Sequence, residues 1–171
     1  MLPAPVLPPA SSPSATTASD KRLWGELLTI LDGLHLHPST RASVKGLSVC
    51  AGMVLARGSS KPIITRWTRR YAKAVRRLNA LLPQLPGWPP SFRWSALQLA
   101  RDTVVEEHED ANNAGPSIAV SVGNFRGGDL VVADVPHSSH DKVCEFDGRI
   151  HHYVSKHVGH RASLIAFTHS A

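Results

Sequence analysis

The second half of the chain is divided into short β-type runs separated by turn residues, and this pattern restricts the fold more than any other feature. Residues 95–101 and 103–106 alternate between apolar and polar side chains. Asn113-Ala-Gly, Gly127-Gly128 and Asp147-Gly148 read as turns between the later runs. Those later runs are 118–122, 130–135, 143–146, 152–155 and 163–167. Many short strands at regular spacing predict a sandwich or jelly roll.

The first half is mainly helical. An apolar stripe from Leu23 to Leu34 predicts a helix that is capped by Ser19 or Asp20 and ends at Gly33. Residues 47–55 read as one short strand, and Thr65 is placed to cap a second helix over residues 66–82. Prolines then interrupt the chain at positions 83, 86, 89 and 90.

These elements predict an α+β protein, with N-terminal helices packed on a C-terminal double-stranded β-helix, or jelly roll. We expect residues 1–18 to be a disordered Pro/Ser-rich tail. Residues 19–91 would form a helical, basic part and residues 92–171 the jelly-roll core of the same domain. A length of 171 residues and an apolar fraction of 42% suit one packed domain and exclude general disorder.

No apolar run has membrane-spanning length, and the proline-broken N-terminus lacks the basic start of a signal peptide. We therefore expect an intracellular protein without membrane contact, with nucleus and cytoplasm left open. Cys50 and Cys144 are expected to be reduced thiols in strands, although one disulfide remains an alternative.

Positive charge is concentrated in the first half. The stretch from Lys21 to Arg77 holds 12 of the 19 Lys and Arg residues, and the net charge of the chain is +6. One face of the helix between Arg66 and Arg77 is crowded with cations that no nearby acid balances. Such a face predicts contact with nucleic acid or another polyanion, and a merely soluble surface is the alternative.

The jelly-roll half contains a set of metal-ligand residues. His108 and Asp110 are two residues apart, so at the end of a strand both side chains point to one face. A second histidine, His152, follows 42 residues after Asp110. Two histidines and one carboxylate form the facial triad that leaves open positions on Fe(II). Those positions suit a bidentate 2-oxo acid and O2.

Arg161 comes nine residues after His152, and Ser163 follows two residues later on the same strand face. An arginine fork with a neighbouring hydroxyl suits the distal carboxylate of 2-oxoglutarate.

The segments HEDANNAGPS, GNFRGGDLVV and EFDGRIHHYVSKHVGHRASLIAFTH resemble the core of the Fe(II)/2-oxoglutarate dioxygenase superfamily over residues 94–171. Within that superfamily, the chain is similar to the ten-eleven-translocation and base-J-type nucleobase oxygenases of protists and fungi. Three features carry this similarity: the stretch after HxD, the G-N-F-x-G-G-x-L turn and the final R-x-S. Prolyl-hydroxylase-like members are the second choice, because their HxD, GGxL and distal histidine-to-arginine order is much the same.

The resemblance implies hydroxylation of a C–H bond with Fe(II), 2-oxoglutarate and O2. His108, Asp110 and His152 would be the catalytic iron ligands, and Arg161 and Ser163 would hold 2-oxoglutarate. His151 is the alternative distal ligand, since adjacent strand residues point to opposite faces. The substrate is expected to be a nucleobase in DNA or RNA. The alternatives are a protein side chain, as in prolyl hydroxylation, or a non-catalytic β-sandwich binding module with a degenerate pocket.

Other polar and aromatic residues have weaker predicted roles. Trp88, Trp94 or Phe125 could stack on a flipped base, although core packing is favoured for each. Asn112 and Asn113 could either orient ligands or turn the chain, and the sequence does not favour one of these roles. His35 and His37, like His137 and His140, are expected in polar loops.

Overall fold

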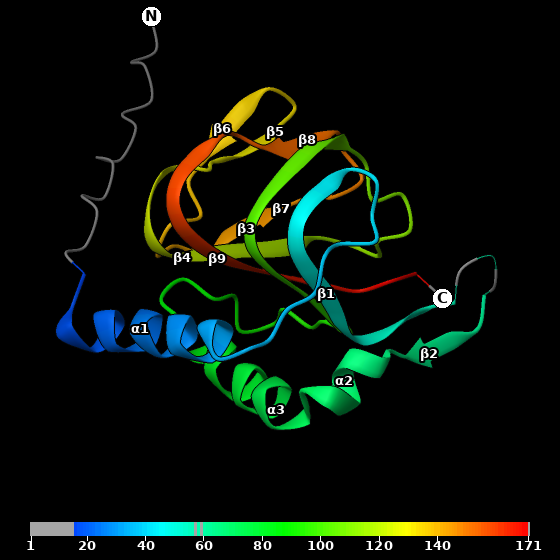
Figure 1. Cartoon of the computed structure of the whole chain (residues 1–171), viewed down its shortest axis with the longest axis horizontal. Coiled ribbons are helices and arrows are strands. Elements are labelled where there is room, and N and C mark those ends of the chain that lie inside the picture. The colour runs from blue at the N-terminus through cyan, green and yellow to red at the C-terminus, as the bar shows by residue number, and fades with distance from the viewer. Residues whose placement is uncertain (1–15, 57, 59, 171) are drawn as a thin grey trace, which may run out of the picture.

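The computed structural model of the chain describes residues 16–56, 58 and 60–170. Figure 1 shows a curled sheet with helices on one side of it. The helices are α1 (Ala18–Asp32), α2 (Arg66–Arg70), α3 (Ala72–Leu81) and the 3₁₀ turn η1 (Leu82–Gln84). The strands are β1 (Val44–Leu55), β2 (Pro62–Ile64), β3 (Ala96–His108), β4 (Ser117–Gly127), β5 (Leu130–Val132), β6 (Val135–His137), β7 (Cys144–Phe146), β8 (His152–Val154) and β9 (His157–Phe167).

The strands form one sheet in the order β6-β5-β8-β3-β9-β4-β7, and β1 joins it on the free edge of β3. All pairings between named strands are antiparallel. The sheet curls so far that it is nearly closed (Figure 1). The predicted α+β class with a jelly-roll core is confirmed.

A bend in β3 divides the sheet into two parts and positions the site. The first half of β3 pairs with β9 as far as Arg101, and the second half pairs with β8 from Val105 to His108. Between them Asp102 has a φ of 48°, which interrupts the extended backbone. The partner strand β1 bends at the same level, where Gly46 has a φ of 114°. The two separate β-type runs predicted over residues 95–101 and 103–106 are therefore one long strand with a bend.

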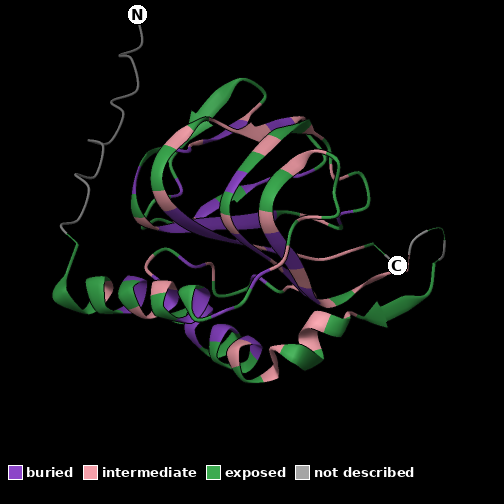
Figure 2. Cartoon of the chain, in the orientation of Figure 1, coloured by how far each residue is buried: buried purple, intermediate pink, exposed green. Residues whose placement is uncertain are grey.

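The helices cover one face of the sheet. Figure 2 shows buried residues on the sides of α1 and α3 that face the sheet and exposed residues on their outer sides. The buried residues that join the two layers are Leu27, Leu31, Leu78, Leu82, Leu99, Val120 and Leu164. The cap of α1 differs from the prediction: Thr17 is the N-cap, and Asp20 completes a capping box three residues later.

The predicted helix over residues 66–82 is wrong as a single element. It breaks at Tyr71, where φ and ψ are −108° and 27°, into α2 and α3. Tertiary bonds explain the break. The Thr68 hydroxyl accepts from the Gly52 backbone N–H at 2.7 Å, which fixes α2 on β1. The Tyr71 hydroxyl donates to the His35 carbonyl, while α3 packs on α1.

The predicted strand over 130–135 is also wrong, because it is a tight hairpin. Ala133 and Asp134 have φ values of 47° and 63°, so both adopt the left-handed turn that joins β5 to β6. Neither residue is glycine, which is why the sequence pattern did not indicate a turn.

The two halves of the chain share one sheet. Strand β1 lies within the predicted helical part, yet it pairs with β3 over most of its length. Of the predicted tail, residues 1–15 lie outside the described residues, and Ala18 already belongs to α1. Both cysteines are free thiols. Among the described residues, none of the helices is both long and apolar enough to cross a membrane.

Candidate metal and anion site

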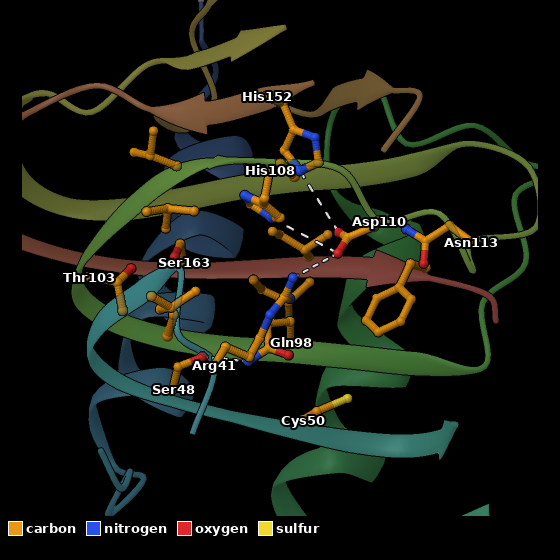
Figure 3. A pocket seen from close by; sticks show the side chains of 18 of the residues that line it. Arg41, Ser48, Cys50, Gln98, Thr103, His108, Asp110, Asn113, His152 and Ser163 are labelled. Atoms are coloured by element: carbon orange, nitrogen blue, oxygen red, sulfur yellow. Dashed lines mark hydrogen bonds and ion pairs between the residues drawn. The ribbon is translucent and has the colours of Figure 1, made fainter. Parts of the chain in front are cut away.

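Three predicted ligands converge where β3 and β8 meet. His108 is the last residue of β3 and pairs directly with His152, the first residue of β8. Asp110 follows β3 after one residue and points at both rings (Figure 3). Asp110 lies 3.9 Å from Nε2 of His108 and 3.8 Å from Nε2 of His152. All three potential ligand atoms lie within 4.8 Å of one another.

Both imidazoles are oriented by the same type of bond. Nδ1 of His108 bonds the Glu106 carbonyl at 2.8 Å, and Nδ1 of His152 bonds the Ile150 carbonyl at 2.8 Å. Because a carbonyl only accepts, each Nδ1 carries a proton, so the lone pair of the neutral ring is on Nε2. Burial lowers the pKa of His152, which favours the neutral ring that binds a metal.

The geometry selects between the two adjacent distal histidines. His152 is buried and belongs to the cluster, whereas His151 does not. The backbone carbonyl of His151 instead accepts from Ala133 at the β5–β6 turn. Among the described residues the cluster contains these three donors, so it does not form a closed four-ligand site.

Asp110 is held by contacts on two sides. Its backbone N–H donates to the Gly148 carbonyl at 2.8 Å. Its Oδ1 accepts from Nη2 of Arg41 at 2.7 Å, an ion pair visible in Figure 3. Sequence reasoning missed Arg41, which is 69 positions away in the chain and carries no motif. Only the folding of β1 against β3 brings it to the site.

Arg161 and Ser163 line the same cavity, which has a volume of about 620 Å³ and also contains the three ligands. Arg161 is only 4% exposed, and its Nε has no hydrogen-bond partner among the described residues. Burial lowers the pKa of Arg161 to about 10, while Asp102 and Asp129 act in the opposite direction. The guanidinium is therefore still charged at neutral pH.

The backbone around Arg161 leaves room for this side chain. Gly128 has a φ of 75°, and a Cβ there would lie 2.9 Å from Nε of Arg161. The backbone N–H of Arg161 donates to Asp102 at 2.7 Å, and the guanidinium carbon lies 5.5 Å from the Phe125 ring centroid. A buried cation with an unused N–H and open space beside it fits a carboxylate ligand.

The remaining predicted site residues have structural positions. Trp88 and Phe125 are buried in the core, Trp94 bonds Asn79, and none of the three lines the cavity. The base-stacking role predicted for them is therefore not supported at this cavity. Asn113 lines the cavity, but its side chain donates to Ser117 at 3.2 Å.

The loop histidines also lie outside the cavity lining. His137 is exposed on β6. His140 stacks on Phe125 at 4.0 Å and bonds the Gly123 carbonyl. His37 packs on Trp67, far along the chain from the metal-ligand cluster.

No protein-family model and no curated protein matches the sequence. Solved structures do match it. A 2OG-Fe(II) oxygenase family oxidoreductase from Burkholderia pseudomallei aligns with a TM-score of 0.55 and 17% identity, over 84% of this chain and 76% of that one. A Pseudomonas putida prolyl-4-hydroxylase aligns with a TM-score of 0.50 and 15% identity, over 91% and 89%. The structure of OsALKBH1 aligns with a TM-score of 0.46 and 14% identity, over 86% and 91%.

At these identities the similarity concerns the fold. The chain has the jelly-roll fold of the Burkholderia pseudomallei oxidoreductase. The predicted double-stranded β-helix is thus confirmed, while the preference for the nucleobase-oxidising branch stays a prediction.

Proposed function

We propose that this protein is an Fe(II)- and 2-oxoglutarate-dependent dioxygenase that hydroxylates a C–H bond. One observation carries the proposal: a three-donor His-Asp-His cluster and a buried arginine with an unpaired Nε line one cavity. A metal site alone would suit many activities. The combination with a desolvated cation suits a metal whose co-substrate carries a carboxylate.

His108, Asp110 and His152 would hold the iron. Their donors are two imidazole nitrogens and one carboxylate, the set typical of non-haem Fe(II) oxygenases. With 2-oxoglutarate and O2, bound Fe(II) supplies oxidation of R–H to R–OH, coupled to conversion of 2-oxoglutarate into succinate and CO2. The protein contributes by fixing both histidine tautomers before the metal arrives.

Arg161 and Ser163 would bind the distal carboxylate of 2-oxoglutarate. The buried guanidinium has lost much of its water and has an unused Nε–H, so a carboxylate restores the missing hydrogen bond and charge pairing. Ser163 lies two residues further along β9, on the same face, and adds a hydroxyl donor.

Part of the cavity wall is apolar. Apolar side chains on β1, β3 and β8 line it, among them Val44, Val105 and Val154. Arg41 adds a partly exposed cation that already bonds Asp110. An apolar lining of this kind protects an oxidation from solvent side reactions.

For the substrate we favour a nucleobase in DNA or RNA. Apart from Arg77, which pairs with Glu26, the cations on α2 and α3 are exposed and form no ion pair within the described part of the chain, and they support this choice. These cations are Arg66, Arg69, Arg70, Lys73 and Arg76. A protein side chain is the second candidate, because one matching fold belongs to a prolyl-4-hydroxylase. A non-catalytic module is disfavoured by the complete set of ligands and anchor.

Succinate formation tests the activity directly. Purified protein with Fe(II), 2-oxoglutarate and O2 is supplied in turn with single-stranded DNA, duplex DNA, RNA and a proline-rich peptide. We expect a nucleic acid to stimulate succinate release and to gain one oxygen atom by mass spectrometry. Asp110→Ala should abolish release, whereas Glu107→Ala, which removes an exposed carboxylate outside the cavity lining, should retain it.

Two outcomes of this assay would change the proposal. Stimulation by the peptide alone would replace the nucleobase with a protein side chain. Absence of succinate under every condition would favour the binding-module alternative.

A further inference from the structure

A second, smaller cavity lies on the outer side of β1, away from the metal site. It is lined by His37, Arg66, Trp67 and Arg70, and we call it the α2 notch. The two cavities share no lining residue, and the start of α2 is fixed to β1 by the Thr65 hydroxyl, which donates to the Cys50 carbonyl at 2.8 Å. The α2 notch is therefore a site of its own.

The aromatic residues of the α2 notch are already packed on one another. The Trp67 ring lies 4.7 Å from the His37 ring and 5.8 Å from the Tyr71 ring, centroid to centroid. The guanidinium carbon of Arg66 lies 4.5 Å from the Trp67 ring centroid. Trp67 therefore contacts His37, Tyr71 and Arg66 at once, and these contacts hold His37 and Arg66 beside it.

Within the described part of the chain, the polar groups of the α2 notch lack hydrogen-bond and ion-pair partners. Nε2 of His37 is buried and has no hydrogen-bond partner within the described residues. Arg66 and Arg70 are exposed and form no ion pair with the acidic residues that the structure describes. Partial burial of the ring and the nearby Arg70, His35 and Arg66 lower the pKa of His37. An unpaired nitrogen in a positive field is suited to an anion.

We propose that the α2 notch binds a phosphate of the nucleic-acid backbone, outside the catalytic cavity. Two arginines and an imidazole N–H supply donors that match phosphate oxygens. Arg69, Lys73 and Arg76 continue the positive surface along α2 and α3, which favours a polymer of phosphates over a single anion. This inference rests on the nucleic-acid form of the proposed function, and it adds the place where the strand is held.

The first test follows His37 by NMR in metal-free full-length protein, without 2-oxoglutarate. A single-stranded thymidine 12-mer is titrated at low salt. We expect the His37 imidazole signals to shift and the pKa of His37 to rise, because the bound phosphate offsets the positive field. His37 signals that stay unmoved while the oligonucleotide binds would overturn the proposal.

Substitutions distinguish a defined phosphate site in the α2 notch from a general attraction of the oligonucleotide to the positive surface. The double variant Arg66→Ala/Arg70→Ala should weaken oligonucleotide binding about tenfold and reduce the slope of log K against log salt by about 0.7, the value for one single-strand phosphate contact. The matched control is Arg22→Ala/Arg93→Ala, which removes the same charge outside the notch. Equal losses in both double variants would contradict a built site. Thermal melting checks that each variant is folded.

Titrations with other phosphate compounds show which type of phosphate the α2 notch binds. Inorganic phosphate should shift the His37 signals only at far higher concentration than the oligonucleotide. Equal affinity for both would make the notch a free-anion site, and a response to phosphatidylserine vesicles alone would make it a lipid site. Either result overturns the backbone assignment. Since no metal or 2-oxoglutarate is present, failure here leaves the succinate assay and the oxygenase proposal untouched.

Discussion

Arg161 has two properties that rarely occur together in a stable core. It is buried, and its Nε has no partner among the described residues. A buried polar group without a partner destabilises the folded state, because its hydration is not replaced. A residue with this arrangement is better explained by a ligand than by a contribution to folding.

Replacement of Arg161 by methionine separates these two effects. Arg161→Met removes the unpaired charge and keeps most of the side-chain volume, so we expect the free energy of unfolding of the ligand-free protein to rise by about 1 kcal/mol. The same variant should lose the increase in melting temperature that 2-oxoglutarate gives in the presence of metal. Denaturant unfolding and thermal melting measure the two quantities. A strong destabilisation of the ligand-free protein would show that Arg161 has a structural role.

The motif predicted which residues lie together in the cluster, and the reason is local; their role as iron ligands stays a prediction. His108 and Asp110 are two positions apart at a strand end, so one local rule places them on the same face. His152 and Arg161 were expected from their order in the motif, and the cavity contains both. The Arg41–Asp110 ion pair was missed, because no local rule links residues that meet only through the β1–β3 pairing.

Among the elements, the turn between β4 and β5 lies directly against the Arg161 side chain. Gly128 and Gly115 both have positive φ values, 75° and 74°. A Cβ on Gly128 would lie 2.9 Å from Nε of Arg161, whereas a Cβ on Gly115 would have nothing within 4 Å. The two positions have similar backbone strain and differ in what surrounds them.

This difference gives a matched pair of variants. Gly128→Ala and Gly115→Ala should each destabilise the protein by about 1–2 kcal/mol, because alanine is strained in the left-handed region. Only Gly128→Ala should also weaken 2-oxoglutarate binding, by displacing the Arg161 guanidinium. Calorimetric titration of 2-oxoglutarate into the metal-loaded variants measures this. Equal 2-oxoglutarate affinities in the two variants would place the guanidinium outside the binding site.

A histidine of β9 adds an ion pair to the apolar contact between α1 and the sheet. His160 bonds Asp32 at the end of α1 at 2.8 Å and lies 3.4 Å from Asp102 of β3. The bond to Asp32, with a further contribution from Asp102, raises the pKa of His160. The stabilisation of the folded state by protonated His160 is therefore complete below the pKa of the unfolded state, about 6.5. It is lost as pH rises through the higher pKa of the folded state.

His160→Gln tests this pH dependence. The variant should have a lower melting temperature than the wild type at pH 6. This difference in melting temperature should decrease as pH rises toward 8.5. We expect a small gap, because His160 is 40% exposed and solvent screens its ion pairs. Melting curves across this range measure it. A gap that is constant with pH would mean that the protonated imidazole does not hold α1 to the sheet.

The elements that the sequence mispredicted are those that tertiary contacts define. The helix break at Tyr71 follows from hydrogen bonds to β1 and to the loop after α1, which are invisible in an amphipathic pattern. The β5–β6 hairpin turns at Ala133 and Asp134 without a glycine to indicate it. By contrast, α1 and most of the β-type runs were predictable, because their apolar spacing depends only on the face that they bury.

At the scale of the whole molecule, the two halves of the chain form one structure with two chemically distinct regions. The jelly roll encloses the cavity with the His-Asp-His cluster and Arg161. The helical half adds β1 and Arg41 to that cavity and presents exposed cations on α2 and α3. The α2 notch shares no lining residue with that cavity, so a polyanion in the notch would contact different side chains from those of the metal site.

In the function that we propose, the cluster binds Fe(II), and 2-oxoglutarate then binds both the metal and Arg161. The most direct measurement is an anaerobic titration of the protein with Fe(II), followed by 2-oxoglutarate, in which the visible charge-transfer absorption of the chelate is recorded. We predict a band in the wild type and in His151→Ala, its loss in His152→Ala, and a weaker 2-oxoglutarate affinity in Arg161→Ala. No band in the wild type at saturating Fe(II) and 2-oxoglutarate, or a band that survives in His152→Ala, would contradict the claim.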